Sequence, residues 1–150
     1  MSADCRLTVT VRPTRDAAEL DAAMALRRTV FLGEQGVSPE EEFDGLDDES
    51  TQIVGLDEAG VIATCRLRYI ESETCKLERM AVEHRLRKLG VGSRLLAGAE
   101  AEARRQGAAE MLLHAQRRAE PFYASNGYVA EGEAFMEAEI EHVRMRKALR

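Results

Sequence analysis

A basic turn with two glycines, residues 85–93, contains the residues whose types and spacing most clearly suggest chemistry. Backbone N–H groups at the start of a helix have no intrahelical partner and lie at the positive end of the helix dipole. Because Gly90 and Gly92 carry no side chain, such N–H groups can approach a phosphate closely at this turn. Further positive charge comes from Arg85, Arg87 and Lys88. The turn therefore predicts a site for a phosphorylated ligand.

Two common phosphate-binding motifs are excluded by the spacing of this turn. A dinucleotide fingerprint requires a third glycine or an alanine where Leu95 stands, and a P-loop requires Gly-Lys-Ser/Thr after four intervening residues. The pattern that remains, Arg87-x-x-Gly90-x-Gly92, resembles the acetyl-CoA signature of the GNAT (Gcn5-related N-acetyltransferase) family.

Other blocks of the sequence resemble the same family, including a strand before the turn and a short helix that ends in Phe-Tyr before a Gly-Tyr turn. The matching blocks are residues 30–31, 34–37, 44–47, 80–82, 114–116, 119–128 and 140–145. Together they are similar to the ElaA/YjcF-type branch of small acetyltransferases. The resemblance covers nearly the whole chain, so we expect residues 1–150 to form a single GNAT N-acetyltransferase domain.

The resemblance implies acetyl-CoA as co-substrate. Exposed backbone groups of a strand can pair with the amides of the pantetheine arm as a neighbouring strand would, and a main-chain N–H there can stabilise the developing oxyanion. Gln116 stands where many relatives carry an asparagine that contacts the pantetheine. The expected cofactor-binding residues are Met80, Ala81, Val82, Arg87, Lys88, Leu89, Gly90, Val91, Gly92, Ser93, Gln116 and Phe122.

Acetyl transfer to an amine requires a proton acceptor and a proton donor. An alkylamine with a pKa of about 10.4 is a free base to less than about one part in a thousand at neutral pH. The resemblance places Tyr123 near the CoA sulfur as general acid. In some relatives a glutamate is the base; its position here is Lys76, and Glu78 lies one step along on the same face. Glu34 and His142 are alternatives to Glu78, or residues that shape the acceptor pocket.

The expected reaction is direct attack by a primary amine of a small acceptor in a ternary complex, with no acyl-enzyme and no metal. A non-catalytic acyl-CoA-binding module and a protein N-acetyltransferase remain as alternatives. The net charge of −6 argues against a general nucleic-acid binder. Because exposed sheet edges can pair with a second copy of the chain, a homodimer is also expected as one possible state.

Length and cysteine content agree with a small cytoplasmic enzyme. A chain of 150 residues can bury a sufficient core as one domain without disulfides or metal. Cys5, Cys65 and Cys75 are an odd number without C-x-x-C spacing, and no signal-peptide pattern or membrane-spanning run is present. The acidic run at 40–49 is interpreted mainly as a solvated loop, with steering of a cationic acceptor as the alternative.

The elements that must position these residues follow from hydrophobic periodicity. We expect a strand over 7–12 that stops at Pro13, a helix capped by Asp16, and a loop from Gly33. The apolar positions of the first helix are Leu20, Met24, Val30 and Phe31. Strands over 52–57, 61–70 and 75–82 should form a meander.

The second half of the chain alternates helices and strands. A helix after Gly90 has apolar positions at Val91, Leu95, Leu96, Ala99 and Ala103, and Gly107 is its expected C-cap. Strands over 109–116, 128–133 and 141–147 follow. These elements predict an α/β domain. The resemblance implies the GNAT fold, with a mixed, mostly antiparallel central sheet that is splayed at a cofactor cleft between strands 75–82 and 109–116 and flanked by helices.

Overall fold

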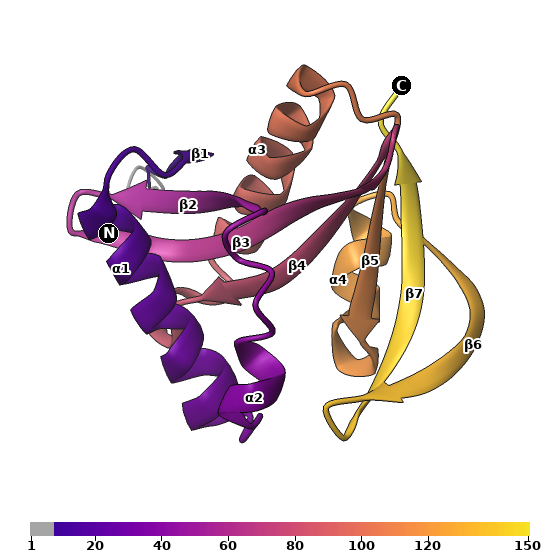
Figure 1. The fold of residues 1–150 in the computed structure, drawn as a ribbon, viewed down its shortest axis with the longest axis horizontal. Coiled ribbons are helices and arrows are strands. Elements are labelled where there is room, and N and C mark those ends of the chain that lie inside the picture. The colour runs from indigo at the N-terminus through magenta and orange to yellow at the C-terminus, as the bar shows by residue number, and fades with distance from the viewer. Residues whose placement is uncertain (1–7) are drawn as a thin grey trace.

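The computed structural model describes residues 8–150 and contains a seven-stranded sheet with helices packed on its two faces (Figure 1). The strand order is β1-β2-β3-β4-β5-β7-β6. Strands β4 and β5 are parallel, and the other neighbouring strands in this order are antiparallel. The predicted α/β class and the mixed, mostly antiparallel sheet are confirmed.

The elements have the following bounds. The strands are β1 (Thr10–Pro13), β2 (Thr51–Asp57), β3 (Gly60–Glu71), β4 (Thr74–Val82), β5 (Glu110–Gln116), β6 (Val129–Glu137) and β7 (Ile140–Ala148). The α-helices are α1 (Ala17–Arg27), α2 (Pro39–Glu42), α3 (Val91–Arg105) and α4 (Glu120–Ser125). Short π- and 3-10-helical turns are η1 (Arg28–Glu34), η2 (His84–Leu86) and η3 (Arg117–Ala119).

The first strand is shifted from its predicted position. A strand was expected over residues 7–12; β1 begins only at Thr10, and Leu7 lies outside the described residues. The strand ends at Pro13, as expected, and Pro13 is its last paired residue, opposite Ile53 of β2. A proline is tolerated within this strand because β1 is the edge of the sheet, where the missing N–H of a proline breaks no ladder bond.

The first helix begins as predicted but does not continue as one α-helix. Asp16 caps α1 by accepting a hydrogen bond from the Glu19 N–H at 2.8 Å. After α1 the chain widens into the π-helical turn η1, which runs past Gly33, where a loop was expected. Such turns are frequent at functional sites. This one delivers Glu34 and Gln35 to the positions from which they contact the regions around β4 and β5.

The meander and helix α3 are confirmed. Strands β2, β3 and β4 pair antiparallel in sequence order. The five predicted apolar positions of α3 are all buried, and Gly107 follows the helix with a φ of 96°, where its N–H donates to Arg104. A Cβ on Gly98 would lie 2.3 Å from Cγ1 of Val11, so α3 contacts the β1 region directly.

The sheet opens between its two parallel strands. Strands β4 and β5 pair only from Thr74 to Leu77 and from Glu110 to Leu113, and the remaining parts of both strands diverge (Figure 1). The predicted splay is therefore confirmed. One edge of β4 from Glu78 to Val82 faces this opening and has no β5 partner.

A β-bulge distorts β4 at the point where the splay begins. Arg66 pairs with Glu78 and Thr64 with Ala81, so Arg79 and Met80 together oppose a single β3 residue. Arg79 has a φ of 58°, a left-handed conformation that costs an arginine free energy and persists only where the surroundings enforce it. Its guanidinium is held by the Glu42 carboxylate at 2.7 Å.

The acidic run at 40–49 is mostly exposed, as expected of a solvated loop, but three of its carboxylates form ion pairs with arginines. Glu42 is only 2% exposed, and its carboxylate accepts from Nε of Arg27 at 2.7 Å. Asp44 and Asp47 pair with the fully buried Arg66 at 2.7 and 3.2 Å. The arginines that pair with this run are distant in the sequence, so the run alone gave no sign of them.

The last two strands form a longer hairpin than predicted. Strands were expected over 128–133 and 141–147, whereas β6 continues to Glu137 and β7 begins at Ile140. The two turn residues, Ala138 and Glu139, have φ values of 51° and 62°. Two positive φ values in succession are typical of a tight type I′ hairpin turn, which fixes the register of the strands on either side.

Candidate active site

The basic turn between β4 and α3 adopts an unusual backbone. Lys88 and Gly90 both have positive φ, at 68° and 84°, and Gly90 is the N-cap of α3. The N–H groups of the first helical turn that follows lack intrahelical acceptors by their position. Alternation of left- and right-handed residues turns successive N–H groups toward one side and makes a concave anion site. The local geometry therefore suits the predicted phosphate site, which the left-handed Lys88 helps to shape.

Arg87 joins a predicted cofactor residue to a predicted acceptor residue. Its Nε donates to the Val82 carbonyl at 3.0 Å, and Nη1 donates to the Glu34 carboxylate at 2.7 Å. Nη1 also lies 3.2 Å from Nδ1 of His84. The pair is partly exposed, with 36% of the Arg87 and 31% of the Glu34 side chain accessible. Glu34 is thus an anion that already occupies Arg87, the predicted phosphate-binding cation.

Gly92 allows close packing beneath the turn. A Cβ at this position would lie 3.2 Å from Cζ of Phe122 and 3.4 Å from Cε of Met80. Phe122 and Met80 therefore occupy the space that a side chain at Gly92 would fill. The sequence interpretation had explained this glycine only by the close approach of a phosphate. In the free protein these apolar groups pack together beside the splay.

Tyr123 projects from α4 into the region of the splay. Its hydroxyl donates to Sδ of Met80 at 3.3 Å, and its ring contacts Phe122 and Tyr128 edge to face. Burial raises the pKa of Tyr123 above its ordinary value of 10. The phenol is therefore protonated at neutral pH and already donates to a sulfur atom.

Gln116 bridges the two sides of the opening. Its Nε2 donates to Oε1 of Gln35, after η1, at 2.7 Å, and Arg118 Nε donates to its Oε1 at 3.2 Å. Gln116 is the last residue of β5, three positions beyond the final β4 contact. The predicted cofactor residue is therefore at the splay, with both functional atoms occupied.

Glu78 lies among three cations. Its carboxylate accepts from Arg66 and Arg68, each at 3.0 Å, and lies 3.1 Å from Nζ of Lys76. Burial acts to raise the pKa of Glu78, but the hydrogen bond from Arg68 and the charges of Lys76 and Arg66 outweigh it and lower the pKa from 4.5 to about 2. A carboxylate so stabilised is a weak proton acceptor, so these surroundings disfavour the predicted role of Glu78 as base.

Glu78 should instead stabilise the fold in a pH-dependent manner. Because its folded pKa is depressed, its contribution is present above the unfolded value and is lost as the pH falls toward about 2. We expect Glu78→Gln to lower the free energy of unfolding by about 2 kcal/mol at about pH 6 and by about half as much at about pH 3. Urea unfolding at both values measures the difference, with the exposed Glu71→Gln as control. An equal loss at both pH values would contradict the ion-pair role.

A second group of titratable side chains gathers on the β5, β6 and β7 strands. His142, predicted as a base or acceptor residue, lies opposite both Gln116 and Phe135. Oε1 of Glu137 lies at hydrogen-bond distance, 3.2 Å, from Nδ1 of His114, and Oε2 lies 3.8 Å from Nε2 of His142. We call His114, Phe135, Glu137 and His142 the imidazole–carboxylate cluster.

The sequence interpretation did not assign Phe135 or Glu137 to the site. Phe135 and Glu137 are two residues apart on β6, so both side chains lie on the same face of the sheet. This spacing could have been recognised in the sequence, but the strand was predicted to end at residue 133. Once the hairpin is seen to continue to Glu137, the pairing of Phe135 with His142 follows from its two-residue turn.

The described cysteines are not arranged for catalysis. Cys65 and Cys75 are buried, and burial raises the pKa of both thiols, that of Cys75 to about 12. A thiol of this kind is a poor nucleophile at neutral pH. Cys5 lies outside the described residues. Within residues 8–150 no group of three His, Cys, Asp or Glu side chains is arranged so that it could hold a metal ion.

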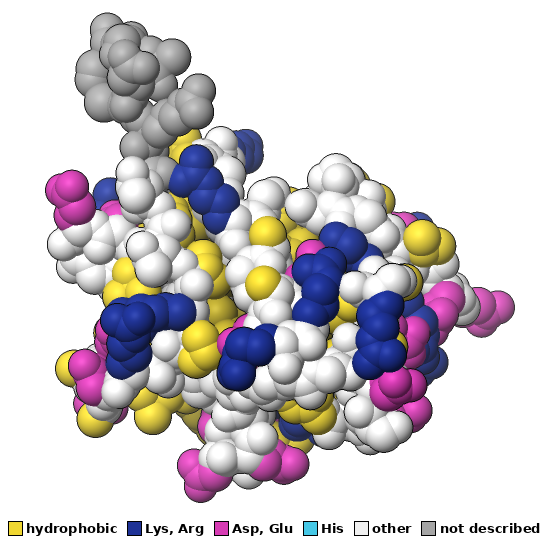
Figure 2. All heavy atoms as spheres, turned by 90° about the horizontal axis from the view of Figure 1, so that it is seen from above, with side chains coloured by type: hydrophobic (Ala, Val, Ile, Leu, Met, Phe, Trp, Pro, Cys, Tyr) yellow, Lys and Arg dark blue, Asp and Glu magenta, His cyan; other side chains and the backbone are white. Residues whose placement is uncertain are grey.

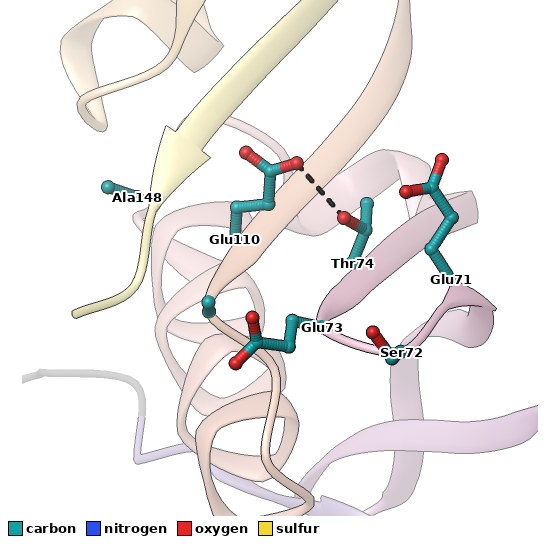
Figure 3. A pocket seen from close by; sticks show the side chains of 7 residues that line it. Glu71, Ser72, Glu73, Thr74, Glu110 and Ala148 are labelled. Atoms are coloured by element: carbon teal, nitrogen blue, oxygen red, sulfur yellow. Dashed lines mark hydrogen bonds between the residues drawn. The ribbon is translucent and has the colours of Figure 1, made fainter.

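Two hollows of the surface lie away from Tyr123 and the basic turn. One of about 270 Å³ lies at the closed end of β4 and β5, where Thr74 donates to Glu110 (Figure 3). Another, of about 330 Å³, lies beside β6 and is lined by Glu131, Gly132, Glu133, Phe135 and Arg144. On the face drawn in Figure 2, basic side chains form separate groups over the middle and acidic ones lie toward the margin. Neither hollow contains Tyr123 or the basic turn.

Comparison with known proteins gives matches over most of the chain. Residues 20–149 match the family model described as an acetyltransferase (GNAT) domain. The chain is 37% identical over 134 residues to the uncharacterised N-acetyltransferase YjcF of Bacillus subtilis (strain 168), covering 89% of this chain and 95% of YjcF.

Solved structures with the same fold also match. An acyl-CoA N-acyltransferase from Pseudomonas aeruginosa has a TM-score of 0.80 at 28% identity, covering 95% of this chain and 99% of that one. Escherichia coli ElaA has a TM-score of 0.80 at 24% identity, covering 94% and 99% of the two chains.

Proposed function

This chain belongs to the GNAT acetyltransferase family, as the sequence predicted, and on that premise we propose that it transfers the acetyl group of acetyl-CoA to a primary amine of a small acceptor. The transfer takes place by direct attack in a ternary complex. The observation that carries this proposal is the position of the Tyr123 hydroxyl, which donates to a sulfur atom on β4 beside the splay.

The donor lies along the unpaired edge of β4 in this proposal. The pyrophosphate binds at the first turn of α3, where Lys88 and Gly90 shape the backbone and N–H groups are available. The pantetheine arm pairs with backbone groups of residues 80–82, although the Val82 carbonyl already accepts from Arg87. Gln116 contacts the arm only after it gives up a hydrogen bond to Gln35 or Arg118.

Tyr123 protonates the leaving thiolate. Its hydroxyl donates to the Met80 thioether in the free protein, so the thiol sulfur of the cofactor takes the place of Met80 as acceptor. Because burial raises the pKa of Tyr123, the phenol carries its proton at neutral pH, and hydrogen-bond contact with the sulfur lets it donate that proton as the carbon–sulfur bond breaks. No acyl-enzyme is formed, in keeping with the burial of Cys65 and Cys75.

The remaining expectations about the whole protein stay predictions. These are a single domain over residues 1–150, a cytoplasmic location, a metal-free reaction, no nucleic-acid or membrane partner, and a homodimer that uses an exposed sheet edge. Among residues 8–150, no helix is long and apolar enough to cross a membrane.

The proposed function is tested with the full chain by calorimetry and a thiol-release assay. We expect one molecule of acetyl-CoA to bind per chain and CoA thiol to be released in the presence of at least one member of a panel of primary amines. The panel includes alkylamines, polyamines, aromatic amines, amino sugars and lysine peptides. Binding without turnover on any amine would favour a non-catalytic acyl-CoA-binding module, and turnover on peptides alone would favour a protein N-acetyltransferase. Failure to bind acetyl-CoA would overturn the proposal.

Neutralising Glu34 should strengthen cofactor binding. In the free protein the Glu34 carboxylate is paired with Arg87 at 2.7 Å, so it competes with the pyrophosphate for that cation. We expect Glu34→Gln to tighten CoA binding by about two- to fivefold, the effect of a partly exposed ion pair. Calorimetry with CoA at low and high salt measures the change, which should decrease with salt.

The matched control for this variant is Glu73→Gln. Glu73 also pairs with an arginine, Arg150, at 3.1 Å, but at the closed end of the sheet. We expect its CoA affinity to equal that of the wild type. Weaker binding by Glu34→Gln would show that Glu34 positions Arg87 for the phosphate and does not compete with it.

A further inference from the structure

The backbone fixes which nitrogen of His142 carries the proton. Nδ1 lies 2.7 Å from the carbonyl oxygen of Ile140, two residues earlier at the start of β7. A carbonyl can only accept a hydrogen bond, so Nδ1 must be the donor. In the neutral imidazole, Nε2 then carries the free lone pair. His142 is therefore held in the tautomer that can accept a proton at Nε2.

A carboxylate stands opposite that lone pair. Oε2 of Glu137 lies 3.8 Å from Nε2 of His142, and its other oxygen lies 3.2 Å from Nδ1 of His114. The tight turn at Ala138 and Glu139 sets the hairpin register and so places Glu137 beside the ring. A carboxylate at this distance is too far for a direct hydrogen bond but stabilises positive charge on the ring.

Phe135 restricts the orientation of both histidine rings. It stacks with His142 at a centroid distance of 6.0 Å and an interplanar angle of 23°, and it meets His114 edge to face at 4.9 Å. Only 9% of the His142 side chain is exposed. The ring is therefore held by the Ile140 carbonyl on one side and by Phe135 across its face.

The cluster lies on the opposite side of the sheet from Tyr123. His142 is directly paired with Gln116 across β5 and β7, and paired residues share a face. Ala115, the next residue along β5, points the other way into the core that contains Tyr123. A thioester held in the splay would thus have the phenol on one side and the imidazole–carboxylate cluster on the other.

Several charged groups lie on the strands and the turn next to the His142 imidazole. His114 of β5 and Glu137 of β6 belong to the cluster, and the Lys76 charge of β4 acts on Glu137. On β7 itself Glu141 lies 3.8 Å from Arg117 of η3, and Arg144 lies 3.9 Å from Glu131 of β6. The carboxylate that faces Nε2 of His142 at 3.8 Å is that of Glu137. The hydrogen bond and charge of His114, with the charges of His142 and Lys76, lower the pKa of Glu137 although its carboxylate is partly desolvated, so it is ionised at neutral pH.

We propose that His142 is the proton acceptor of the acetyl transfer and that Glu137 is its positioning residue. The inference rests on the proposed function and deepens it. The amine lone pair forms a bond to the thioester carbon, and Nε2 of His142 takes a proton from the resulting ammonium nitrogen. The carbon–sulfur bond then breaks, its electron pair goes to sulfur, and sulfur takes the proton of Tyr123. The imidazolium returns its proton to solvent, and the phenolate regains one from solvent.

The sequence left both Glu78 and His142 as candidates for the proton acceptor, and the structure distinguishes their surroundings. Glu78 is neutralised by three cations, which makes it a structural anion with little affinity for a proton. His142 has a free nitrogen, a fixed tautomer and an anion that favours its protonated form. Imidazole is also the side chain that changes charge near neutral pH, where a general base is most effective.

The kinetic test compares His142→Gln and Glu137→Gln with the wild type, using the amine of the panel that the wild type acetylates fastest. We expect His142→Gln to lower kcat/KM for the amine by about 100-fold or more and to remove the acid limb of its pH profile. Glu137→Gln should lower it about tenfold and move that limb to lower pH. Glu133→Gln, a carboxylate change on the same strand, should leave both unchanged. Calorimetry should give wild-type affinity for acetyl-CoA in all three variants.

A second measurement needs no acceptor. Long-range proton–nitrogen correlation spectra of the ¹⁵N-labelled free protein should show the neutral His142 ring protonated at Nδ1. A ring protonated at Nε2 would overturn the inference. So would a wild type that turns over an amine while His142→Gln keeps its rate and pH profile, and in that case the proposed function would stand. A wild type with no turnover would contradict the proposed function itself.

Discussion

Replacing Tyr123 with phenylalanine is expected to lower kcat by about 100- to 1,000-fold while changing the affinity for acetyl-CoA by less than about twofold. The substitution removes only the hydroxyl that donates to Sδ of Met80 and keeps the ring that packs against Phe122 and Tyr128. Without that proton the thiolate leaves unassisted, so the loss falls on the chemical step. Steady-state thiol release measures kcat, and calorimetry measures binding.

The matched control is Tyr128→Phe. Tyr128 is buried like Tyr123, but its hydroxyl donates to the Glu100 carboxylate at 2.8 Å. We expect this variant to lose stability and to keep kcat within about threefold, since Glu100 belongs to the pair with Lys147 and not to the splay. Equal loss of kcat in the two variants, or full activity in Tyr123→Phe, would remove Tyr123 as the acid.

Removing the charge of Arg66 is expected to have the largest effect on stability. Arg66 is fully buried, and its guanidinium pairs with Asp44, Asp47 and Glu78 at 2.7 to 3.2 Å. An apolar replacement leaves these carboxylates without their shared cation in a poorly solvated place. We expect Arg66→Met to lower the free energy of unfolding by about 3–5 kcal/mol, as measured by urea titration at neutral pH.

Arg68→Met is the control for this variant. Arg68 contacts only Glu78 among the same carboxylates, and 22% of its side chain is exposed. Its replacement should cost about 1 kcal/mol or less. If Arg66→Met does not fold at neutral pH, its refolding at lower pH tests the same claim. Protonation of the three carboxylates removes the negative charge that Arg66 no longer compensates. A loss no greater than that of Arg68→Met would contradict the network.

Features set by local pattern were predictable from the sequence. The apolar positions of α3, the Asp16 cap and the Gly107 termination each depend on a few neighbouring residues and a known backbone preference. The basic turn was recognised because Gly90 and Gly92 follow a cationic run next to a strand. The splay between β4 and β5 came from the family resemblance, since strand periodicity carries no information on where two strands separate.

Features that depend on distant partners were not predictable from pattern. The ion pairs of the run at 40–49 were not predicted because Arg27, Arg66 and Arg79 lie elsewhere in the sequence. Glu78 was chosen as base for its position on β4, and its three cationic neighbours appear only in the folded sheet. Glu137 was overlooked because the length of the β6–β7 hairpin depends on two non-glycine residues, 138 and 139, that adopt positive φ.

The central claim is that the carrier lies along the free edge of β4 with its sulfur at Tyr123, and a crystal structure of the full chain with bound CoA tests it most directly. We predict pyrophosphate oxygens at hydrogen-bond distance, about 3 Å, from N–H groups of the turn that contains Gly90 and Gly92. The CoA sulfur should replace Sδ of Met80 as the acceptor of the Tyr123 hydroxyl. CoA bound elsewhere on the chain, with the β4 edge empty and Tyr123 still donating to Met80, would contradict the account.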